Sequence, residues 1–199
     1  MRSSLLLAAL ALASCSTPPP TEESDKKTEA PAAPVKPPEE YRVRLETTEG
    51  PIVIAVHRVW APRGADHFYD LVTQRFYDGS RFHRVVYPFI AQWGVAARPE
   101  INAIWNTAQI PDDPMPDIKG KMPLNRLGTV AFAQLGPSTR TTQVFINLTD
   151  NPNLDEKRFV PFGEVVEGME VTKRLYSFYG EPAPEGKGPD STRLQRKRC

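Results

Sequence analysis

The chain has 199 residues, which is enough for one folded domain and an extension. Apolar residues make up 40% of it and charged residues 25%, an ordinary balance for a globular protein. A net charge of +1 offers no electrostatic attraction for nucleic acid, so we expect no nucleic-acid partner.

The first 14 residues have the pattern of a secretion signal peptide. Arg2 supplies a positive charge, and residues 5–13 (LLLAALALA) form an apolar run too short to span a bilayer as a helix. The run continues into Leu-Ala-Ser-Cys at 12–15, which resembles the bacterial lipobox. This resemblance implies cleavage before Cys15, lipidation of Cys15 and anchoring in a bacterial cell envelope. An ordinary signal peptide with a chance cysteine is the alternative, and Cys199 is the only other cysteine.

Residues 16–40 (STPPPTEESDKKTEAPAAPVKPPEE) contain seven prolines and a single large apolar residue, Val35. Such a composition cannot form a core, and its prolines favour extended polyproline II. We therefore predict that residues 15–40 are a lipidated cysteine followed by a disordered tether, at most roughly 80 Å long. The folded domain is expected to comprise residues 41–199.

The first half of that domain begins with two alternating runs around a Glu-Gly-Pro turn, which predicts a β-hairpin over residues 41–57. Next, APRGADHFYDLVTQRFY has a proline in its first turn and apolar residues at helical spacing, which predicts an amphipathic helix. The stretch 81–95 (RFHRVVYPFIAQWGV) predicts one or two strands but contains Arg84. A buried arginine costs several kcal/mol unless it is paired or functional.

In the second half, residues 96–127 are expected to be mostly irregular. Strands are predicted over residues 128–134, 143–148 and 159–168, and a helix over residues 169–178. Short strands that come in groups, with only two helices, argue against a parallel βαβ sheet. They favour an antiparallel barrel or sandwich with helices attached.

The residues exclude most common chemistries. The three histidines show no ligand spacing, and Asp112-Asp113 is better explained as a loop cap than as a metal site, so we expect no metal. The G-x-S-x-G, G-x-G-x-x-G and P-loop motifs are absent, and no cofactor is expected. One arginine, two glutamines and many apolar residues remain. This set suits a mostly apolar ligand that is acted on electrostatically, without proton transfer.

Three blocks of the sequence resemble the cyclophilin-type peptidyl-prolyl isomerases, in the order and spacing of that family. RFHRVVYPFIAQWG resembles its first signature, GTVAFAQLGPSTRTTQVFINL its second, and NLDEKRFVPFGEVVEGMEV its third block. The resemblance covers about residues 41–178. It implies a mainly β fold, a closed eight-stranded antiparallel β-barrel capped by two α-helices, with the active groove on its outside.

By position, Arg84 stands at the family's catalytic arginine, which implies that it stabilises the twisted X-Pro amide. The residues that the resemblance implies for substrate binding are Phe89, Ile90, Gln92, Ala133, Gln134, Leu135, Gln143, Phe145, Asn153, Leu154 and Phe159. The implied partners are proline-containing segments of unfolded or exported proteins, and a monomer is expected. A non-catalytic proline-peptide binding module, or a holdase chaperone on the same fold, is one alternative. In another, Arg84 has only a structural role and forms an ion pair with a nearby acid.

Four positions depart from the family pattern. Tyr87-Pro88 stands where the family usually has Pro-Gly, and Trp93 replaces a glycine. Asn153 takes the place of a groove tryptophan and Phe159 that of a histidine. Asn153 weakens one wall of the groove, which implies poor cyclosporin sensitivity and an altered peptide preference. Tyr87 and Trp93 are the positions where a reshaped site is expected first. The family closes its barrel with a last strand, for which STRLQRKRC is a poor candidate.

Overall fold

The computed structural model describes residues 36–114 and 123–182 of the chain. Its first two strands, β1 (Glu40–Thr47) and β2 (Gly50–His57), pair in antiparallel register from Glu40 opposite His57 to Thr47 opposite Gly50. Along β1 the apolar residues are the more buried and the charged residues are exposed, as expected for a strand with one face on a core. The predicted hairpin is confirmed.

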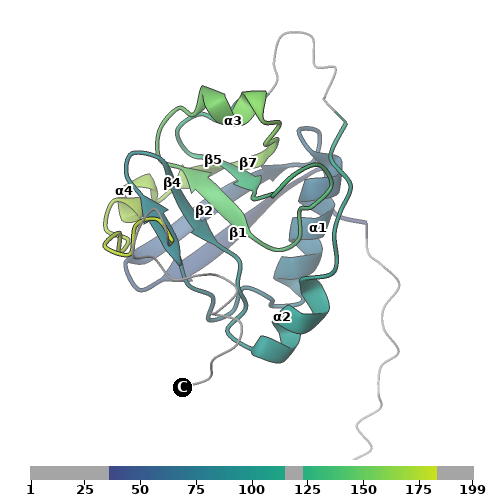
Figure 1. The fold of residues 1–199 in the computed structure, drawn as a ribbon, viewed down its shortest axis with the longest axis horizontal. Coiled ribbons are helices and arrows are strands. Elements are labelled where there is room, and N and C mark those ends of the chain that lie inside the picture. Colours follow the sequence, from purple (N-terminus) through teal and green to yellow (C-terminus); the bar gives the residue numbers. More distant parts are fainter. Residues whose placement is uncertain (1–35, 115–122, 183–199) are drawn as a thin grey trace, which may run out of the picture. The chain divides into compact units, whose positions relative to one another are not determined.

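Seven strands form one antiparallel sheet in the order β1-β2-β7-β5-β6-β4-β3 (Figure 1). The remaining strands are β3 (Arg84–Val86), β4 (Ile90–Trp93), β5 (Thr129–Phe132), β6 (Val144–Asn147) and β7 (Pro161–Glu167). β1 and β3 are the edge strands, and the described residues contain neither an eighth strand nor a pairing between these two edges. The mainly β prediction therefore holds, whereas the closed eight-stranded barrel is not seen in this part of the chain. The sequence STRLQRKRC lies outside the described residues.

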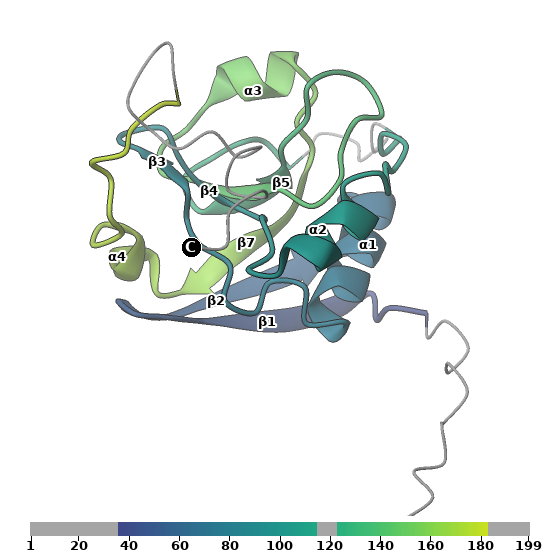
Figure 2. The same cartoon turned by 60° about the horizontal axis from the view of Figure 1, so that its bottom comes forward.

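The sheet curls around the main core (Figure 2). One cluster joins buried side chains from β1 and β2, near one edge of the sheet, to Trp93 of β4 near the other. A flat sheet could not bring strands so far apart in its order into one cluster. Fully burying an isoleucine or phenylalanine contributes about 1.5–3 kcal/mol, so this cluster is the main source of stability. Its largest fully buried members include Phe68, Phe76, Phe132 and Phe162.

Residues 36–114 and 123–182 contain four helices, whereas the sequence predicted two. α1 (Pro62–Thr73) is the predicted amphipathic helix, with Ala65, Phe68 and Leu71 fully buried. α3 (Pro152–Glu156) is a short helix that precedes β7, and α4 (Met169–Thr172) ends well before the predicted boundary at 178. α1 and α4 lie at opposite ends of the curled sheet in both views (Figures 1 and 2), and both contribute buried side chains to the main core. No helix in the described ranges combines the length and apolar character needed to cross a bilayer.

α2 (Pro99–Trp105) lies in a stretch that was predicted to be irregular. Its only buried residue is Asn102, whose amide accepts from the N–H of Ala96 and donates to the carbonyl of Ala96, both at 2.8 Å. Ile101 and Trp105 pack against the main core. Residues 96–127 are otherwise mostly irregular where they are described, as predicted, but the helix itself was missed although Ile101 and Trp105 have helical spacing.

Candidate active site

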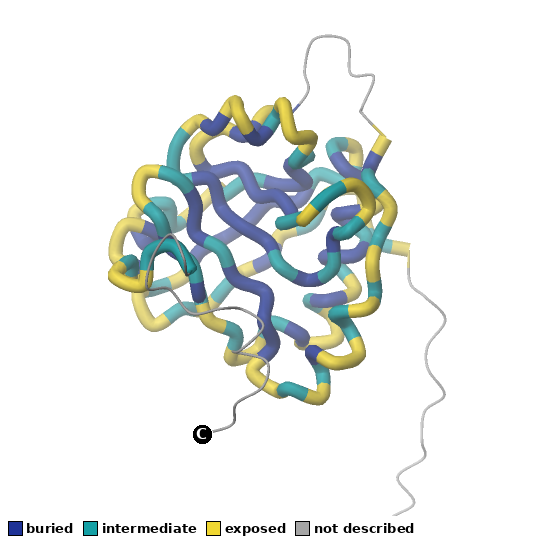
Figure 3. The backbone as a smooth tube through the Cα atoms, viewed as in Figure 1, coloured by how far each residue is buried: buried dark blue, intermediate teal, exposed yellow. Residues whose placement is uncertain are grey.

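Strands β4, β5 and β6 are buried almost throughout, on both of their faces (Figure 3). Side chains alternate along a strand, so Val144 and Ile146 face the main core while Phe145 faces the other way. The second face carries a separate cluster, which we call the outer cluster. It consists of Ile90, Ala131, Phe145 and Leu154, with Phe89, Ala133 and Phe159 packed against them.

The outer cluster brings together residues that the sequence placed in three separate blocks. The rings of Phe145 and Phe159 meet nearly edge-on, with centroids 5.8 Å apart and an angle of 69° between their planes. Ala131 was not predicted as a site residue. Its alternation with Val130 and Phe132, which lie in the main core, could have indicated that it faces outward.

One row of residues crosses the sheet on this face. Arg84 of β3 lies directly opposite Gln92 of β4, Gln92 opposite Phe145 of β6, and Phe145 opposite Ala131 of β5. Directly opposed residues on antiparallel strands have Cβ atoms about 4.5–5.5 Å apart and point to the same side. The register of four strands therefore places Arg84 at the margin of the outer cluster.

Arg84 is held by polar and aromatic neighbours. Its Nη1 donates to Oε1 of Gln92 at 3.1 Å, and Nε2 of Gln92 donates to Oε1 of Gln143 at 2.8 Å. The Arg84 guanidinium carbon lies 5.5 Å from the centroid of the Phe89 ring, a cation–π distance. A fixed planar donor thus lies next to apolar surface, which is the arrangement that the residue inventory suggested.

Arg84 also forms an ion pair with an acid, as one alternative expected, but the sequence did not identify which acid. Its Nε and Nη2 donate to the two carboxylate oxygens of Glu181, each at 2.6 Å. Glu181 is 97 residues away in sequence and follows α4, outside all three family-like blocks. No sequence signal could have identified it, because its only link to the site is spatial.

The segment Ala133–Leu135 follows β5 and was predicted to offer its backbone to a peptide. The N–H of Ala133 donates to the carbonyl of Gln143 at 2.8 Å, and that of Leu135 donates to Thr139 Oγ1 at 2.9 Å. The Gln134 side chain donates to the Lys157 carbonyl at 3.2 Å, and the Leu135 side chain is fully exposed. Two of the three N–H groups are therefore already used within the protein.

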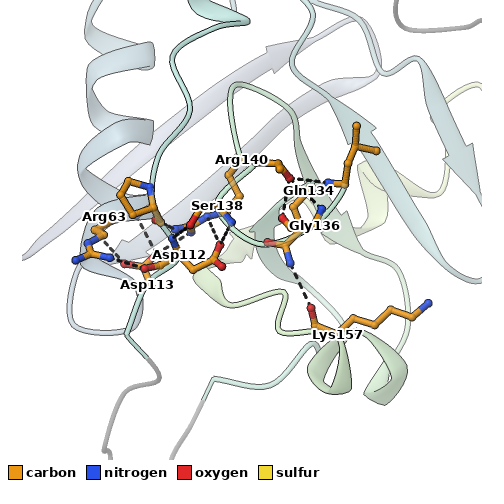
Figure 4. A network of polar contacts seen from close by, with 12 residues as sticks. Arg63, Asp112, Asp113, Gln134, Gly136, Ser138, Arg140 and Lys157 are labelled. Atoms are coloured by element: carbon orange, nitrogen blue, oxygen red, sulfur yellow. Dashed lines mark hydrogen bonds and ion pairs between the residues drawn. The ribbon is translucent and has the colours of Figure 1, made fainter.

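A buried ion pair between Asp113 and Arg140 lies beside this segment (Figure 4). The Asp113 carboxylate accepts from Nη1 of Arg140 at 2.7 Å, and from the N–H groups of Arg63 and Gly64, at the start of α1, at 2.6 and 3.1 Å. A Cβ at Gly64 would lie 3.3 Å from both Asp113 and Arg140, which leaves little room for a side chain there. The pair thus joins α1 to the 111–114 loop and to the loop that follows Ala133–Leu135.

The predicted residues of the third block lie on or beside α3. Leu154 is buried in the outer cluster, and Phe159 packs against it. Asn153 is exposed on the same helix. Asn125 fixes this region by donating through its side-chain nitrogen to the Asp155 carboxylate and to the Phe159 carbonyl, both at 2.7 Å.

The two unusual residues of the first block behave differently. Trp93 is 3% exposed and packs in the main core against Phe82, so the expectation that it reshapes the site is wrong. Trp93 alternates with Gln92 and so faces inward. Gly94, at φ +118°, is the residue that needs to be a glycine, because a Cβ there would lie 2.4 Å from the Thr142 carbonyl oxygen. Tyr87 is partly exposed and donates to the Thr172 carbonyl in α4.

Two buried histidines flank the site without forming a metal centre. His83 precedes Arg84 and lies against Gln143, and His67 of α1 donates through Nε2 to the Thr141 carbonyl at 2.6 Å. Burial lowers the pKa of both imidazoles from 6.5, although their hydrogen bonds oppose this shift. Among the described residues, no three His, Cys, Asp or Glu side chains gather where they could hold a metal ion.

The lowered pKa values of His67 and His83 should make the stability of the protein depend on pH. Because each pKa is lower in the folded than in the unfolded state, unfolding takes up protons below pH 6.5. The free energy of unfolding should be flat above about pH 7 with respect to these groups and fall on acidification, by at most about 1.4 kcal/mol per pH unit for each histidine. Urea unfolding at pH 7.5 and 5.5, repeated for His67→Asn and His83→Asn, measures each share. A variant with an unchanged pH dependence would contradict the assignment.

The family model described as "Cyclophilin type peptidyl-prolyl cis-trans isomerase/CLD" matches residues 42–189, most of the chain. The chain belongs to the cyclophilin family. It is a cyclophilin-type peptidyl-prolyl cis-trans isomerase, and proline-containing peptides are the ligands typical of this family.

Relatives from a yeast and a bacterium match this cyclophilin in sequence. Peptidyl-prolyl cis-trans isomerase ppi1 of Schizosaccharomyces pombe is 35% identical over 133 residues, which cover 67% of this chain and 83% of that protein. A peptidyl-prolyl cis-trans isomerase of Acinetobacter baylyi is 31% identical over 138 residues, which cover 67% and 70%. A crystal structure of a cyclophilin from Cryptosporidium parvum matches the fold with a TM-score of 0.58 at 24% identity, over 75% of this chain and 90% of that one.

Proposed function

We propose that this cyclophilin isomerises X-Pro bonds of exported proteins at a bacterial cell envelope, with Arg84 as its catalytic residue. The observation that carries the assignment to Arg84 is the row across β3, β4, β6 and β5, which places a guanidinium beside the outer cluster. In this proposal the outer cluster binds the proline ring. Gln92, Gln143 and the 133–135 segment hold the peptide on either side of it.

The chemistry needs no proton transfer. The amide before proline is planar, with a rotation barrier near 20 kcal/mol, and uncatalysed exchange takes tens of seconds or more. Rotation removes the resonance and localises the lone pair on nitrogen. A donor directed at that nitrogen, or at the rotating carbonyl oxygen, stabilises the twisted amide more than either planar form.

Arg84 suits this role because its guanidinium stays charged and offers N–H donors in a fixed plane. A thousandfold acceleration requires about 4 kcal/mol of differential stabilisation. A charge-assisted hydrogen bond at a partly buried site can supply much of this. The Arg84 side chain is 21% exposed, so its hydrogen bonds are only partly screened by water.

Asn153 and Phe159 shape the expected specificity. An exposed asparagine on α3 removes one wall that a tryptophan would provide, and Phe159 keeps that side of the outer cluster apolar. We therefore propose a groove that is more open on the α3 side, with low affinity for cyclosporin. Cys15 and the tether up to residue 35 lie outside the described residues. The end of the predicted tether is ordered, because Glu40 already belongs to β1 and the N–H of Arg58 donates to the Glu39 carbonyl at 2.9 Å.

The envelope location predicts a lipidated Cys15. When the full chain is produced in a bacterium with a labelled fatty acid, the label should appear on the protein and the protein should sediment with membranes. Cys15→Ala should lose the label, because no other residue near the signal run carries a thiol. Cys199→Ala is the matched control and should keep the label. An unlabelled wild-type chain, or equal labelling of Cys15→Ala, would contradict the anchor.

The role in export is tested by refolding. An exported protein whose slow refolding phase reports proline isomerisation should refold faster with catalytic amounts of this cyclophilin. The acceleration should be lost with Arg84→Ala. A wild-type chain that binds the unfolded client without accelerating this phase would instead support the holdase alternative.

A further inference from the structure

The strongest unexplained contact in the site is the one between Arg84 and Glu181. Both oxygens of the carboxylate are engaged, one by Nε and the other by Nη2, each at 2.6 Å. The third nitrogen, Nη1, already donates to Gln92. Each of the three guanidinium nitrogens therefore has a protein partner, and one partner carries a full negative charge.

This pairing opposes the role proposed for Arg84. A carboxylate is a much stronger acceptor for guanidinium than the neutral carbonyl or amide nitrogen of a peptide. While Glu181 is in place, it neutralises the charge that would stabilise the twisted amide. It also occupies the edge of the guanidinium that carries Nε and Nη2.

The pair is also placed where it can open. The side chains of Arg84 and Glu181 are 21% and 32% exposed, so water can replace each partner. Glu181 lies outside the strands and helices, in the segment that follows α4. An ion pair that is partly exposed to water is weaker than the same pair fully buried, because solvent competes for both charges.

We propose that Glu181 is a built-in competitor of the substrate, which masks Arg84 in part of the molecules and so limits the rate of isomerisation. The apparent affinity of a site that is competent only in a fraction of molecules is reduced by that fraction. This inference rests on Arg84 being the catalytic residue. It assigns to Glu181 the opposite effect from that of a residue that orients Arg84 for catalysis.

Glu181→Gln tests the proposal, because it removes the charge with little change of shape. With the full chain in mild detergent and a short X-Pro peptide, kcat/KM should rise between about twofold and tenfold over wild type. Glu170→Gln, at an exposed acid in α4, is the matched control and should leave the rate unchanged. An unchanged or lower rate in Glu181→Gln would overturn the proposal and favour an orienting or purely structural contact.

Two further measurements test whether the effect of Glu181→Gln acts through Arg84. In the Arg84→Ala background, Glu181→Gln should give no increase, since the masked group is gone; a persisting increase would overturn the mechanism. Peptide affinity measured by NMR titration tests the mask without turnover, and Glu181→Gln should bind more tightly than wild type. Equal affinities would overturn the proposal, whereas a wild-type chain that binds but does not isomerise would count against the catalytic role alone.

Raising the salt concentration provides an internal check. Added salt screens the partly exposed Arg84–Glu181 pair, so wild type should approach the rate of Glu181→Gln as salt increases. Any direct effect of salt on the peptide is the same for wild type and Glu181→Gln, so it cancels in the ratio of the two rates. A rate ratio that stays constant from low to high salt would contradict a charge-based mask.

Discussion

Arg84→Ala should lower kcat/KM for a short X-Pro peptide by about a hundredfold to a thousandfold. Losing one preorganised donor to a developing transition state typically costs this much in enzymes that act by electrostatic stabilisation. In free energy this corresponds to about 3–4 kcal/mol of transition-state stabilisation. The kcat/KM of Arg84→Lys should lie between those of wild type and Arg84→Ala, because lysine keeps the positive charge but lacks the planar set of N–H donors.

The loss should not come from unfolding. Arg84 lies on edge strand β3 with a partly exposed side chain, and the variant leaves the Glu181 carboxylate able to reach water. Circular dichroism and urea unfolding should therefore resemble those of wild type. Arg126→Ala, at an exposed arginine, is the control for removing a positive charge. Activity of Arg84→Ala within twofold of wild type would rule out the assigned mechanism.

Asp113→Asn should reduce the free energy of unfolding by about 3–5 kcal/mol, the usual cost of removing one partner of a buried ion pair. The Asp113 side chain is completely buried and that of Arg140 is 4% exposed, so the arginine would keep its charge without an adequate partner. The amide would also place donors toward the N–H groups of Arg63 and Gly64. Urea unfolding measures this loss directly.

The adjacent acid provides the control for this variant. Asp112 is 44% exposed and lies 3.8 Å from Nε of Arg140, so Asp112→Asn should cost no more than about 1 kcal/mol. Asp113→Asn/Arg140→Met should be more stable than Asp113→Asn alone, because the unpaired charge is removed. If the two single variants lose equal stability, the buried pair does not have the role assigned to it.

Sequence reasoning succeeded where a local pattern carries the information. The hairpin over 41–57 and helix α1 follow from period-two and helical spacing, and both are present. The residues that resembled family positions in the first two blocks do lie together, because Arg84, Gln92 and Phe145 occupy one row of the sheet. The register of the strands places these residues, which are separate in sequence, side by side on one face of the sheet.

Sequence reasoning failed where the information is spatial or lies in polar contacts. α2 has only one apolar i, i+4 pair, Ile101 and Trp105, and the hydrogen bonds of Asn102 to Ala96 that hold it cannot be read from a sequence pattern. Alternation with Gln92 predicts that the Trp93 side chain faces the main core. The prediction placed it near the groove instead, because it differs from the glycine of the family pattern. Glu181 reaches Arg84 only through the path of the chain after α4, so its contact could not be predicted.

The site and the core share the same three strands. On β6, Phe145 faces the outer cluster, where we propose that the peptide binds, while Val144 and Ile146 on either side of it face the main core. The layer that separates the main core from the proposed peptide site is therefore one strand thick. In a close-packed interior a change of even one methylene is transmitted to its neighbours. Mutations that adapt the core of this cyclophilin to a new temperature will thus alter its choice of peptide as well, and its stability and specificity must evolve together.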